Sequence, residues 1–429
     1  MRALVLVFLV VFACLTPARA DFPAGWAAYQ AGDYGTAFEN WLPRANAGDL
    51  DAMYDVAVLY ENGMGVDRDL RRAVNWYRAA AEKHFAPAQF RLGQLYHSGL
   101  GVEADPKKAL VWYERAADQG YPEAQYNIGV AYETGGLVPP DGGQAAHWYE
   151  LAAEQGLPTA QYNLGRLHFE GKVVPKNVAL AAEWFRRAAK AGFAPAQNNL
   201  AYMYENGLHV PENAEEAARW YRKAAEQGFA LAQTNLGIML NFGIGVARDH
   251  GEAAHWYRAA ATKGDAQAQI QLALLLANGQ GVARDPVEAY AWLVLAGEGG
   301  SQAADTADAY RERLTQQLGP EQMAAAERRT AALRGELAAV KPPPAWRSVP
   351  RESGEFGRPE ITVQRRLSTL GLYTGAIDGL VGPGTVSAIR AFQRKARLKV
   401  NGRISPQLIE ALDAAVRERA AAKADAPSQ

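Results

Sequence analysis

The sequence has only one cysteine in 429 residues, Cys14, which lies in an apolar stretch near the N-terminus. If that stretch is removed on export, the mature chain has no cysteine. Disulfide bonds, thiolate catalysis and cysteine-based metal sites are then excluded. Long apolar runs are missing as well. No segment after residue 20 is apolar over the length that a transmembrane helix needs, so we expect no membrane span in the mature chain.

Known catalytic motifs are also absent. The chain has no His-Glu-x-x-His, no Gly-x-Ser-x-Gly, no Walker loop, and no serine followed by lysine three residues later. His147 and Glu150 have an i,i+3 spacing, but no second histidine is near them, so a structural or solvent-facing His147 is the preferred interpretation. We therefore predict no catalytic residue, no metal site, no cofactor and no nucleic-acid partner.

The first 20 residues have the features of an export signal. Arg2 precedes an apolar run from Ala3 to Ala13 that is too short to cross a membrane, and Ala18-Arg19-Ala20 provides a small-x-small cleavage site. We expect cleavage after Ala20 and a periplasmic location. A lipoprotein anchored through Cys14 is the less favoured alternative, because Phe12 is bulky for a lipoprotein cleavage box.

Charge is divided unevenly along a chain whose formal net charge is −1. Residues 21–340 carry a net charge of −10, whereas residues 341–429 carry 15 Lys+Arg against 8 Asp+Glu, a net of +7. An acidic region is thus joined to a basic one, which indicates different partners for the two parts.

Tryptophans recur at a nearly constant spacing. The first interval is 35 residues and every later interval is 36, with tryptophans at Trp41, Trp76, Trp112, Trp148, Trp184, Trp220, Trp256 and Trp292. A fixed period of this length indicates tandem copies of one supersecondary unit, and therefore an open solenoid. A solenoid offers a long surface to macromolecular partners and seldom forms a deep catalytic pocket.

Each copy is predicted to contain two helices joined by a glycine-rich turn. The second helix begins after a capping residue that recurs every 36 residues: Asp69, Asp105, Asp141, Asn177, Asn213, Asp249 and Asp285. It ends at a residue expected in the left-handed region: Gly48, Gly120, Gly156, Gly192, Gly228, Gly264 and Gly300. His84 replaces glycine in one copy, and histidine tolerates this conformation better than most residues.

Small residues at one phase of the first helix should let helices approach closely, and we expect the tryptophans to fill the seams between units. The small residues are Gly93, Gly129, Gly165, Ala201, Gly237 and Ala273. Replacing a seam-filling tryptophan by alanine would cost about 3–5 kcal/mol.

The string Ala124-Gln125-Tyr126-Asn127-Ile128-Gly129, followed by Tyr132, Trp148-Tyr149 and Ala152-Ala153, resembles the Sel-one-like repeats, a branch of the tetratricopeptide-like helical repeats. The resemblance implies seven copies over residues 50–300. Residues 21–49 are interpreted as an N-terminal cap, and residues 301–340 as closing helices. The predicted fold is all-α: a right-handed α/α solenoid of helix-turn-helix repeats, followed by a small three-helix domain.

A proline- and glycine-rich linker over 341–357 separates the array from a different pattern over 358–416, which leaves 417–429 as a tail. The pattern includes Gln364, Leu367, Leu370-Gly371, Ile377-Asp378-Gly379, Gly382-Pro383 and Phe392-Gln393, and it resembles the three-helix peptidoglycan-binding domain of cell-wall enzymes. Arg397 stands where that family usually has glycine. The resemblance implies murein as a ligand. The candidate contacts are Tyr373, Asp378, Arg390, Arg394 and Lys395, although Asp378 suits a turn and a basic helix face can simply be solvated.

Four asparagines share one phase of the first helix in successive copies: Asn127, Asn163, Asn199 and Asn235. On the concave face of such an array their amides could clamp the backbone of an extended peptide. Alternatively, these amides satisfy loop carbonyls between units. Both hypotheses remain open on the sequence.

Together these features favour an exported, periplasmic scaffold. Its array would bind an unidentified protein or peptide, and its C-terminal domain would tether the assembly to peptidoglycan. Two alternatives are a cell-wall hydrolase with an unrecognised site, and a secreted regulator or effector that binds a sensor or a host protein.

Overall fold

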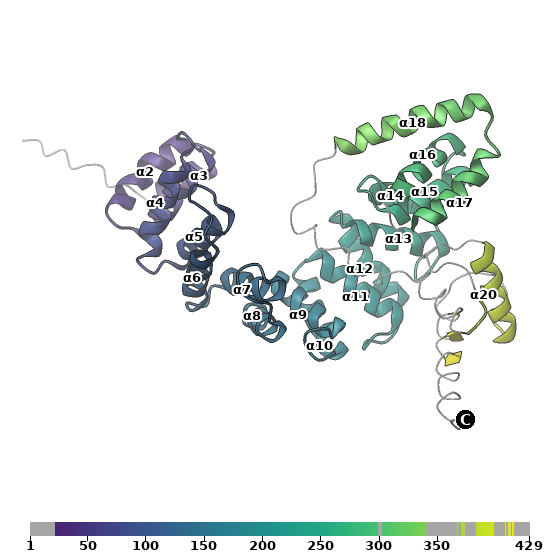
Figure 1. The fold of residues 1–429 in the computed structure, drawn as a ribbon, viewed down its shortest axis with the longest axis horizontal. Coiled ribbons are helices and arrows are strands. Elements are labelled where there is room, and N and C mark those ends of the chain that lie inside the picture. The colour runs from purple at the N-terminus through teal and green to yellow at the C-terminus, as the bar shows by residue number, and fades with distance from the viewer. Residues whose placement is uncertain are drawn as a thin grey trace, which may run out of the picture. The chain divides into compact units, whose positions relative to one another are not determined.

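The structure is a computed structural model that describes residues 22–298 and 303–339, and, in the C-terminal module, residues 367, 370–373, 383–398, 408, 411–412 and 414–415. All regular elements within these ranges are α-helices, and consecutive helices pack in pairs as a solenoid (Figure 1). The all-α solenoid predicted from the sequence is confirmed. The chain divides into two compact units, Met1–Ala160 and Gln161–Gln429, called here the first and the second unit.

In the first unit, each helix packs on the next one in sequence. Its helices are α1 (Phe22–Gln30), α2 (Tyr34–Asn46), α3 (Leu50–Asn62), α4 (Leu70–Ala81), α5 (Ala86–Ser98), α6 (Pro106–Ala117), α7 (Pro122–Thr134) and α8 (Gly142–Glu154). Helix α9 (Pro158–Glu170) contains the boundary between the units.

The second unit continues the same alternation and is followed by two closing helices, of which the second is longer than the repeat helices. Its helices are α10 (Val178–Lys190), α11 (Ala194–Asn206), α12 (Ala214–Glu226), α13 (Ala230–Phe242), α14 (His250–Ala261), α15 (Ala266–Asn278), α16 (Pro286–Glu298), α17 (Ala303–Thr315) and α18 (Pro320–Ala338), with α20 (Pro383–Lys395) in the C-terminal module. Helices α17 and α18 both pack on α16. None of the described helices is both long and apolar enough to span a bilayer.

The predicted helix caps form in every copy. The side-chain oxygen of each capping Asp or Asn accepts the backbone N–H three residues later, at 2.8–3.0 Å: Asp69, Asp105, Asp141, Asn177, Asn213, Asp249 and Asp285. Each bond satisfies a donor that the first helical turn leaves without an intrahelical partner. The sequence therefore sets the start of each second helix locally.

The ends of these helices also follow the prediction. Among the described residues of the series, each closing glycine has a positive φ, from 79° at Gly264 to 98° at Gly48. His84 adopts φ 63° at the same position. The left-handed conformation is thus required by the turn, and a histidine is held in it where glycine is missing.

In six of the seven repeats the residue after the tryptophan is a fully buried aromatic ring, whereas the tryptophan in most copies is only partly buried against the hydrophobic clusters. That the tryptophans fill the seams between units stays a prediction. Tyr77, Tyr113, Tyr149, Phe185, Tyr221 and Tyr257 are at most 1% exposed. Of the eight tryptophans, Trp41, Trp184 and Trp292 are buried, and the other five are partly exposed. On helices with 3.6 residues per turn, adjacent positions differ by about 100°, so the two members of each pair point in different directions.

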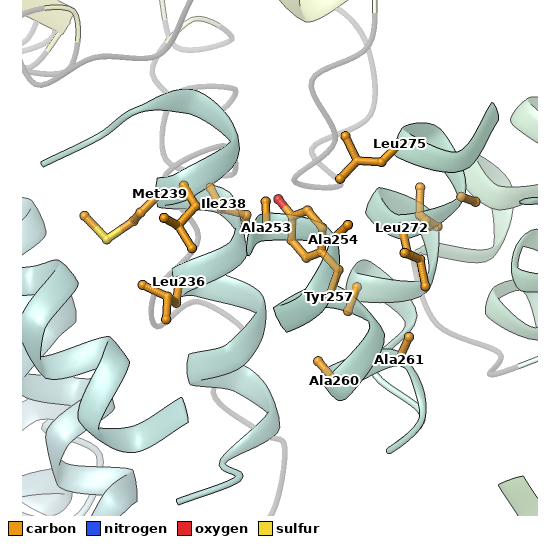
Figure 2. Close-up of a cluster of buried hydrophobic side chains, with 14 of the residues drawn as sticks. Leu236, Ile238, Met239, Ala253, Ala254, Tyr257, Ala260, Ala261, Leu272 and Leu275 are labelled. Atoms are coloured by element: carbon orange, nitrogen blue, oxygen red, sulfur yellow. The ribbon is translucent and has the colours of Figure 1, made fainter. Parts of the chain in front are cut away.

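The small residues of the first helix receive these rings. A Cβ atom added to Gly129 would lie 2.7 Å from the ring of Tyr149, and one added to Gly237 would lie 2.6 Å from the ring of Tyr257. Figure 2 shows Tyr257 among Leu236, Ile238 and Met239 of α13 and Leu272 of α15. The close approach expected from the glycines is confirmed, and it joins the two helices of one repeat.

Buried glutamines link consecutive repeats. Each donates from Nε2 to a backbone carbonyl eight residues earlier, at the end of the preceding helix pair: Gln89, Gln125, Gln197, Gln233 and Gln269. The Oε1 atom of four of them accepts a hydrogen bond from a side chain 30 residues later, namely Gln119, Gln155, Gln227 and Lys263. These amides are buried and hydrogen-bonded to the preceding repeat, so they fix the register of neighbouring repeats.

Candidate functional site

Helix α20 gives the C-terminal module a buried face and a basic exposed face. Ile389 and Phe392 are 0% and 3% exposed, and Leu367, Leu408 and Leu412 are buried as well. Arg390, Arg394 and Lys395 are exposed on the same helix, with Arg390 and Arg394 at i,i+4 spacing. Cations near the C-terminal end of a helix are favoured by its dipole. The arrangement presents positive charge that can pair with carboxylates.

The turn after α20 contains the residue that departs from the family pattern. Arg397 has φ 57°, and the N–H of Leu398 donates to the carbonyl of Gln393 at 2.9 Å. The position thus adopts the left-handed conformation for which glycine is suited, and an arginine is strained there. The turn forms despite the substitution.

Of the other predicted murein contacts, Tyr373 is partly buried and follows the turn at Gly371, which has φ 73°. Asp378 lies outside the described residues. The structure therefore brings the three cations together on one helix, and the two remaining candidates stay predictions.

The asparagine ladder starts in the first unit at Asn127, which is partly exposed and shares a side-chain hydrogen bond with Tyr113. Burial raises the pKa of Tyr113 to about 12, so the phenol stays protonated. In the second unit Asn163 is also partly exposed. A role of these two amides in peptide binding stays a prediction.

The other two asparagines of the ladder are engaged inside the second unit. Asn199 is 6% exposed and Asn235 is 1% exposed. Asn235 donates to the Oδ1 atom of Asn198 at 3.1 Å, Asn198 donates to Asn199 at 3.4 Å, and Asn199 shares a side-chain hydrogen bond with Tyr162. Their partners are side chains of the array, and none of these bonds is to a loop carbonyl.

A group of three glutamates 72 residues apart was missed from the sequence. Glu61, Glu133 and Glu205 each accept the hydroxyl of the buried tyrosine 16 residues later, at 2.6–2.8 Å: Tyr77, Tyr149 and Tyr221. The spacing was visible in the sequence, as was the 36-residue spacing of the buried glutamines. A periodicity search that included polar residues would have found both.

The charged partner differs between Glu61 and Glu205. Glu61 also pairs with Arg91, whose Nε lies 3.1 Å from Glu61 Oε2 and which contacts Oε1 through Nη2. Arg91 and Asn127 have the same phase in consecutive repeats. In the second unit Asn235 stands at this phase, and the Oε1 atom of Glu205 has no hydrogen-bond partner.

Burial raises the pKa of Glu205 to about 7; the hydrogen bond from Tyr221 opposes this shift, and the nearby charge of Glu212 adds to it. Asp55, at the ladder phase in the first repeat, also has a pKa raised to about 7 by burial and by Asp51 and Asp49. Among the described residues, no three His, Cys, Asp or Glu side chains are grouped to hold a metal ion.

Comparison with known families identifies the array. The Sel1 repeat matches seven consecutive segments of the chain: residues 50–85, 86–121, 122–157, 158–193, 194–229, 230–265 and 266–301. The chain belongs to the Sel1-repeat family. The repeat boundaries of this Sel1-repeat protein coincide with the start of each first helix from α3 onward.

Solved structures agree with this assignment. The Sel1-repeat protein is similar to a protective antigen present in uropathogenic Escherichia coli strains, described as displaying an SLR fold, with 27% identity, a TM-score of 0.62 and 95% of each chain covered. It is also similar to a Sel1 repeat protein from Oxalobacter formigenes, with 32% identity and a TM-score of 0.53, over 56% of this chain and 98% of that one.

The C-terminal module of the Sel1-repeat protein matches the peptidoglycan binding domain family over residues 361–412. The chain is also 45% identical, over 51 residues, to the spore cortex-lytic enzyme of Bacillus cereus. That match spans 12% of this chain and a fifth of the length of the enzyme. The two families indicate protein partners for the array and peptidoglycan for the module.

Proposed function

We propose that this chain is an exported scaffold that holds a protein partner at the cell wall. The observation that carries the proposal is the presence, in one chain, of seven Sel1 repeats and a peptidoglycan binding domain. The segment preceding Asp21 would direct export to the periplasm. The array would recruit the partner, and the module would tether it, so that the effective concentration of the partner near murein rises without covalent chemistry.

The basic face of α20 supports wall attachment. Peptidoglycan stems carry carboxylates, and the exposed Arg390, Arg394 and Lys395 supply charges that can pair with them. Tyr373 and Asp378 complete the proposed wall contacts. Because exposed ion pairs are screened by salt, binding should weaken as ionic strength rises.

The proposed partner contacts are the ladder amides. Asn127 and Asn163 are the members that are partly exposed, so their amides would bond the backbone of an extended segment. Asn199 and Asn235 would act through the buried side chains to which they are bonded. Replacing Asn127 and Asn163 by alanine should weaken partner binding with little change in the melting temperature if the clamp is correct. Asn199→Ala and Asn235→Ala should lower the melting temperature, because both side chains are buried and hydrogen-bonded.

The proposal is tested by sedimenting purified sacculi with the full chain and with a chain truncated at Lys341. The full chain should pellet and the truncated chain should stay in the supernatant. The triple variant Arg390→Ala, Arg394→Ala, Lys395→Ala should pellet at least several-fold less. Arg397→Gly is the matched control, because it removes one positive charge of the module outside the α20 face.

Two outcomes would redirect the function. The similarity to a cortex-lytic enzyme makes a wall hydrolase the second candidate, and it predicts release of soluble muropeptides from the sacculi. Equal pelleting of the full and truncated chains would show that the C-terminal module does not attach the chain to the wall. A tight crosslinked protein partner without wall attachment would then favour a secreted regulator or effector.

A further inference from the structure

The second unit contains a buried carboxylate whose charge has no cationic partner. Glu205 is 4% exposed, its Oε2 atom accepts the hydroxyl of Tyr221 at 2.8 Å, and its Oε1 atom is buried without a hydrogen bond. A buried carboxylate is unfavourable in its ionised form without a cation beside it. A group in this state therefore either binds a proton or needs a cationic partner.

In the first unit, the glutamate at the same position of the repeat has a cationic partner. Glu61 is 144 residues before Glu205, four whole repeats, and it accepts the hydroxyl of Tyr77 in the same way. Its second partner is Arg91 in the following repeat, 30 residues later. Arg91 is 30% exposed, so this guanidinium approaches the glutamate from the surface of the array.

In the second unit the residue 30 positions after the glutamate is Asn235, which is too short to take the place of an arginine. The Nδ2 atom of Asn235 is used by Asn198, and its Oδ1 atom is buried without a hydrogen bond. Two acceptor oxygens, Glu205 Oε1 and Asn235 Oδ1, thus lack donors at the two repeat positions that Glu61 and Arg91 occupy in the first unit.

A donor group with a positive charge would satisfy this pair, since both atoms accept hydrogen bonds and one belongs to a carboxylate. A guanidinium group supplies several N–H donors in a planar fork, whereas a neutral donor would leave the carboxylate charge uncompensated. The neutral alternative is a proton held on Glu205 itself.

We propose that Glu205 and Asn235 form a seat for an arginine side chain of the protein that binds the array, entering where Arg91 lies in the first unit. The inference rests on the proposed scaffold function and specifies the chemistry of the partner. An entering arginine displaces the proton from Glu205 and fixes the partner on α11 and α13. Wall attachment by the C-terminal module does not involve this seat.

The first test rebuilds the first-unit arrangement within the full chain. In Asn235→Arg the new side chain should reach Glu205, and the pKa of Glu205, followed by the carboxyl ¹³C signal of labelled glutamate, should fall by at least one unit. Asn199→Arg is the matched control, because the residue 30 positions earlier is Phe169. It should lower the melting temperature by several degrees. An unchanged Glu205 titration in folded Asn235→Arg would overturn the proposal.

The second test measures binding to the unsubstituted chain and uses two folded variants only for signal assignment and as a control. The full, ¹³C-glutamate-labelled chain is titrated with acetyl-Gly-Arg-Gly-amide and with the citrulline analogue, which is similar in shape but uncharged. The signal absent from Glu205→Gln identifies Glu205. It should shift saturably with the arginine peptide, with at least a tenfold weaker response to citrulline, and should not respond in Asn235→Arg. No response, or an equal response to both peptides, refutes the seat. Sacculus pelleting and partner capture would still report on the scaffold function separately.

Discussion

The two units are built from the same repeat, but the glutamates that accept the buried tyrosine hydroxyls, Glu61 and Glu205, have different further partners. In both units an Asp or Asn caps the second helix, a buried ring packs on a small residue, and a glutamine spans adjacent repeats. In the first unit Glu61 has a tyrosine and an arginine as partners, and in the second Glu205 has only a tyrosine. Residue types that recur at one position of every copy stabilise the fold. Positions where the residue type varies between copies give each part of the array its own chemistry.

The largest expected effect concerns the buried aromatic ring that the repeats of both units share. Tyr149→Ala and Tyr221→Ala should each lower the free energy of unfolding by about 3–5 kcal/mol, because each removes a fully buried ring. Trp148→Ala, on the same helix as Tyr149, should cost only about 1–2 kcal/mol because Trp148 is partly exposed. Urea denaturation followed by circular dichroism measures both. A larger loss for Trp148 than for Tyr149 would show that the partly exposed tryptophan contributes more to packing than the buried ring.

The second prediction is that the same Glu→Gln change affects stability differently in the two units. Glu61→Gln should lower stability at pH 7 by about 1–3 kcal/mol, because Arg91 loses its charged partner. Glu205→Gln should not lower stability at pH 7.5, because no buried charge has to be formed at that position. Equal losses in the two variants would show that Glu205 has a cationic partner within the folded chain.

The pH dependence of Glu205 follows from its raised pKa. Its value is about 7 in the folded chain and 4.5 in the unfolded chain, so between these limits the folded state binds more protons. Stability from this group is therefore present at low pH and falls as pH rises from 4.5 to 7, by roughly 3 kcal/mol. Glu205→Gln should flatten this decline. Part of the slope should remain, since Asp55 titrates in the same window. An unchanged slope would contradict the assignment.

A smaller effect, equal in the two units, is expected from the helix caps. Asp105→Ala and Asp249→Ala should each cost about 1 kcal/mol, because each leaves a backbone N–H of the first turn without its partner. Asp249→Asn keeps the acceptor oxygen and should be nearly neutral. Thermal unfolding of the three variants measures the difference, and a loss in Asp249→Asn as large as in Asp249→Ala would mean that charge rather than the hydrogen bond matters.

The smallest effect concerns the closing position of the second helix. His84→Gly should raise stability by about 0.5–1 kcal/mol, since glycine adopts φ 63° without the steric cost that histidine has. The reciprocal change, Gly120→His, should lower stability by a similar amount. A gain in Gly120→His would show that the backbone angle does not set the preference.

The sequence was sufficient to predict the helices, because their signals are local and repeat. The caps at Asp69 to Asp285 and the left-handed ends are each specified by one residue type at one phase. The sequence did not show that Tyr149 and not Trp148 is the fully buried ring, because both are large apolar side chains and helix phase determines which one points inward. Periodicity in the sequence gives the spacing of the residues along one helix face, but it does not show whether that face points into the core or toward solvent.

The candidate sites were less predictable, because they depend on contacts between residues that carry no local signal. That Asn235 bonds Asn198, and that Glu205 lacks the arginine found beside Glu61, follow from packing between repeats. The basic face of α20 could be foreseen from the spacing of Arg390 and Arg394. Which carboxylates it meets depends on the ligand, and the sequence does not encode the ligand.

The glutamine links also determine how such a protein can change in length. Gln233 donates to the carbonyl of Ala225, and Gln269 donates to the carbonyl of Ala261, which is the same position one repeat later. If residues 230–265 were lost as a block, Gln269 would lie opposite the carbonyl of Ala225 in place of that of Ala261, so this hydrogen bond between adjacent repeats could form again. Insertions or deletions of whole 36-residue copies are therefore compatible with the fold, whereas changes of other lengths would break the chain of amides. The array can vary its reach by gene duplication while each new junction is already complementary.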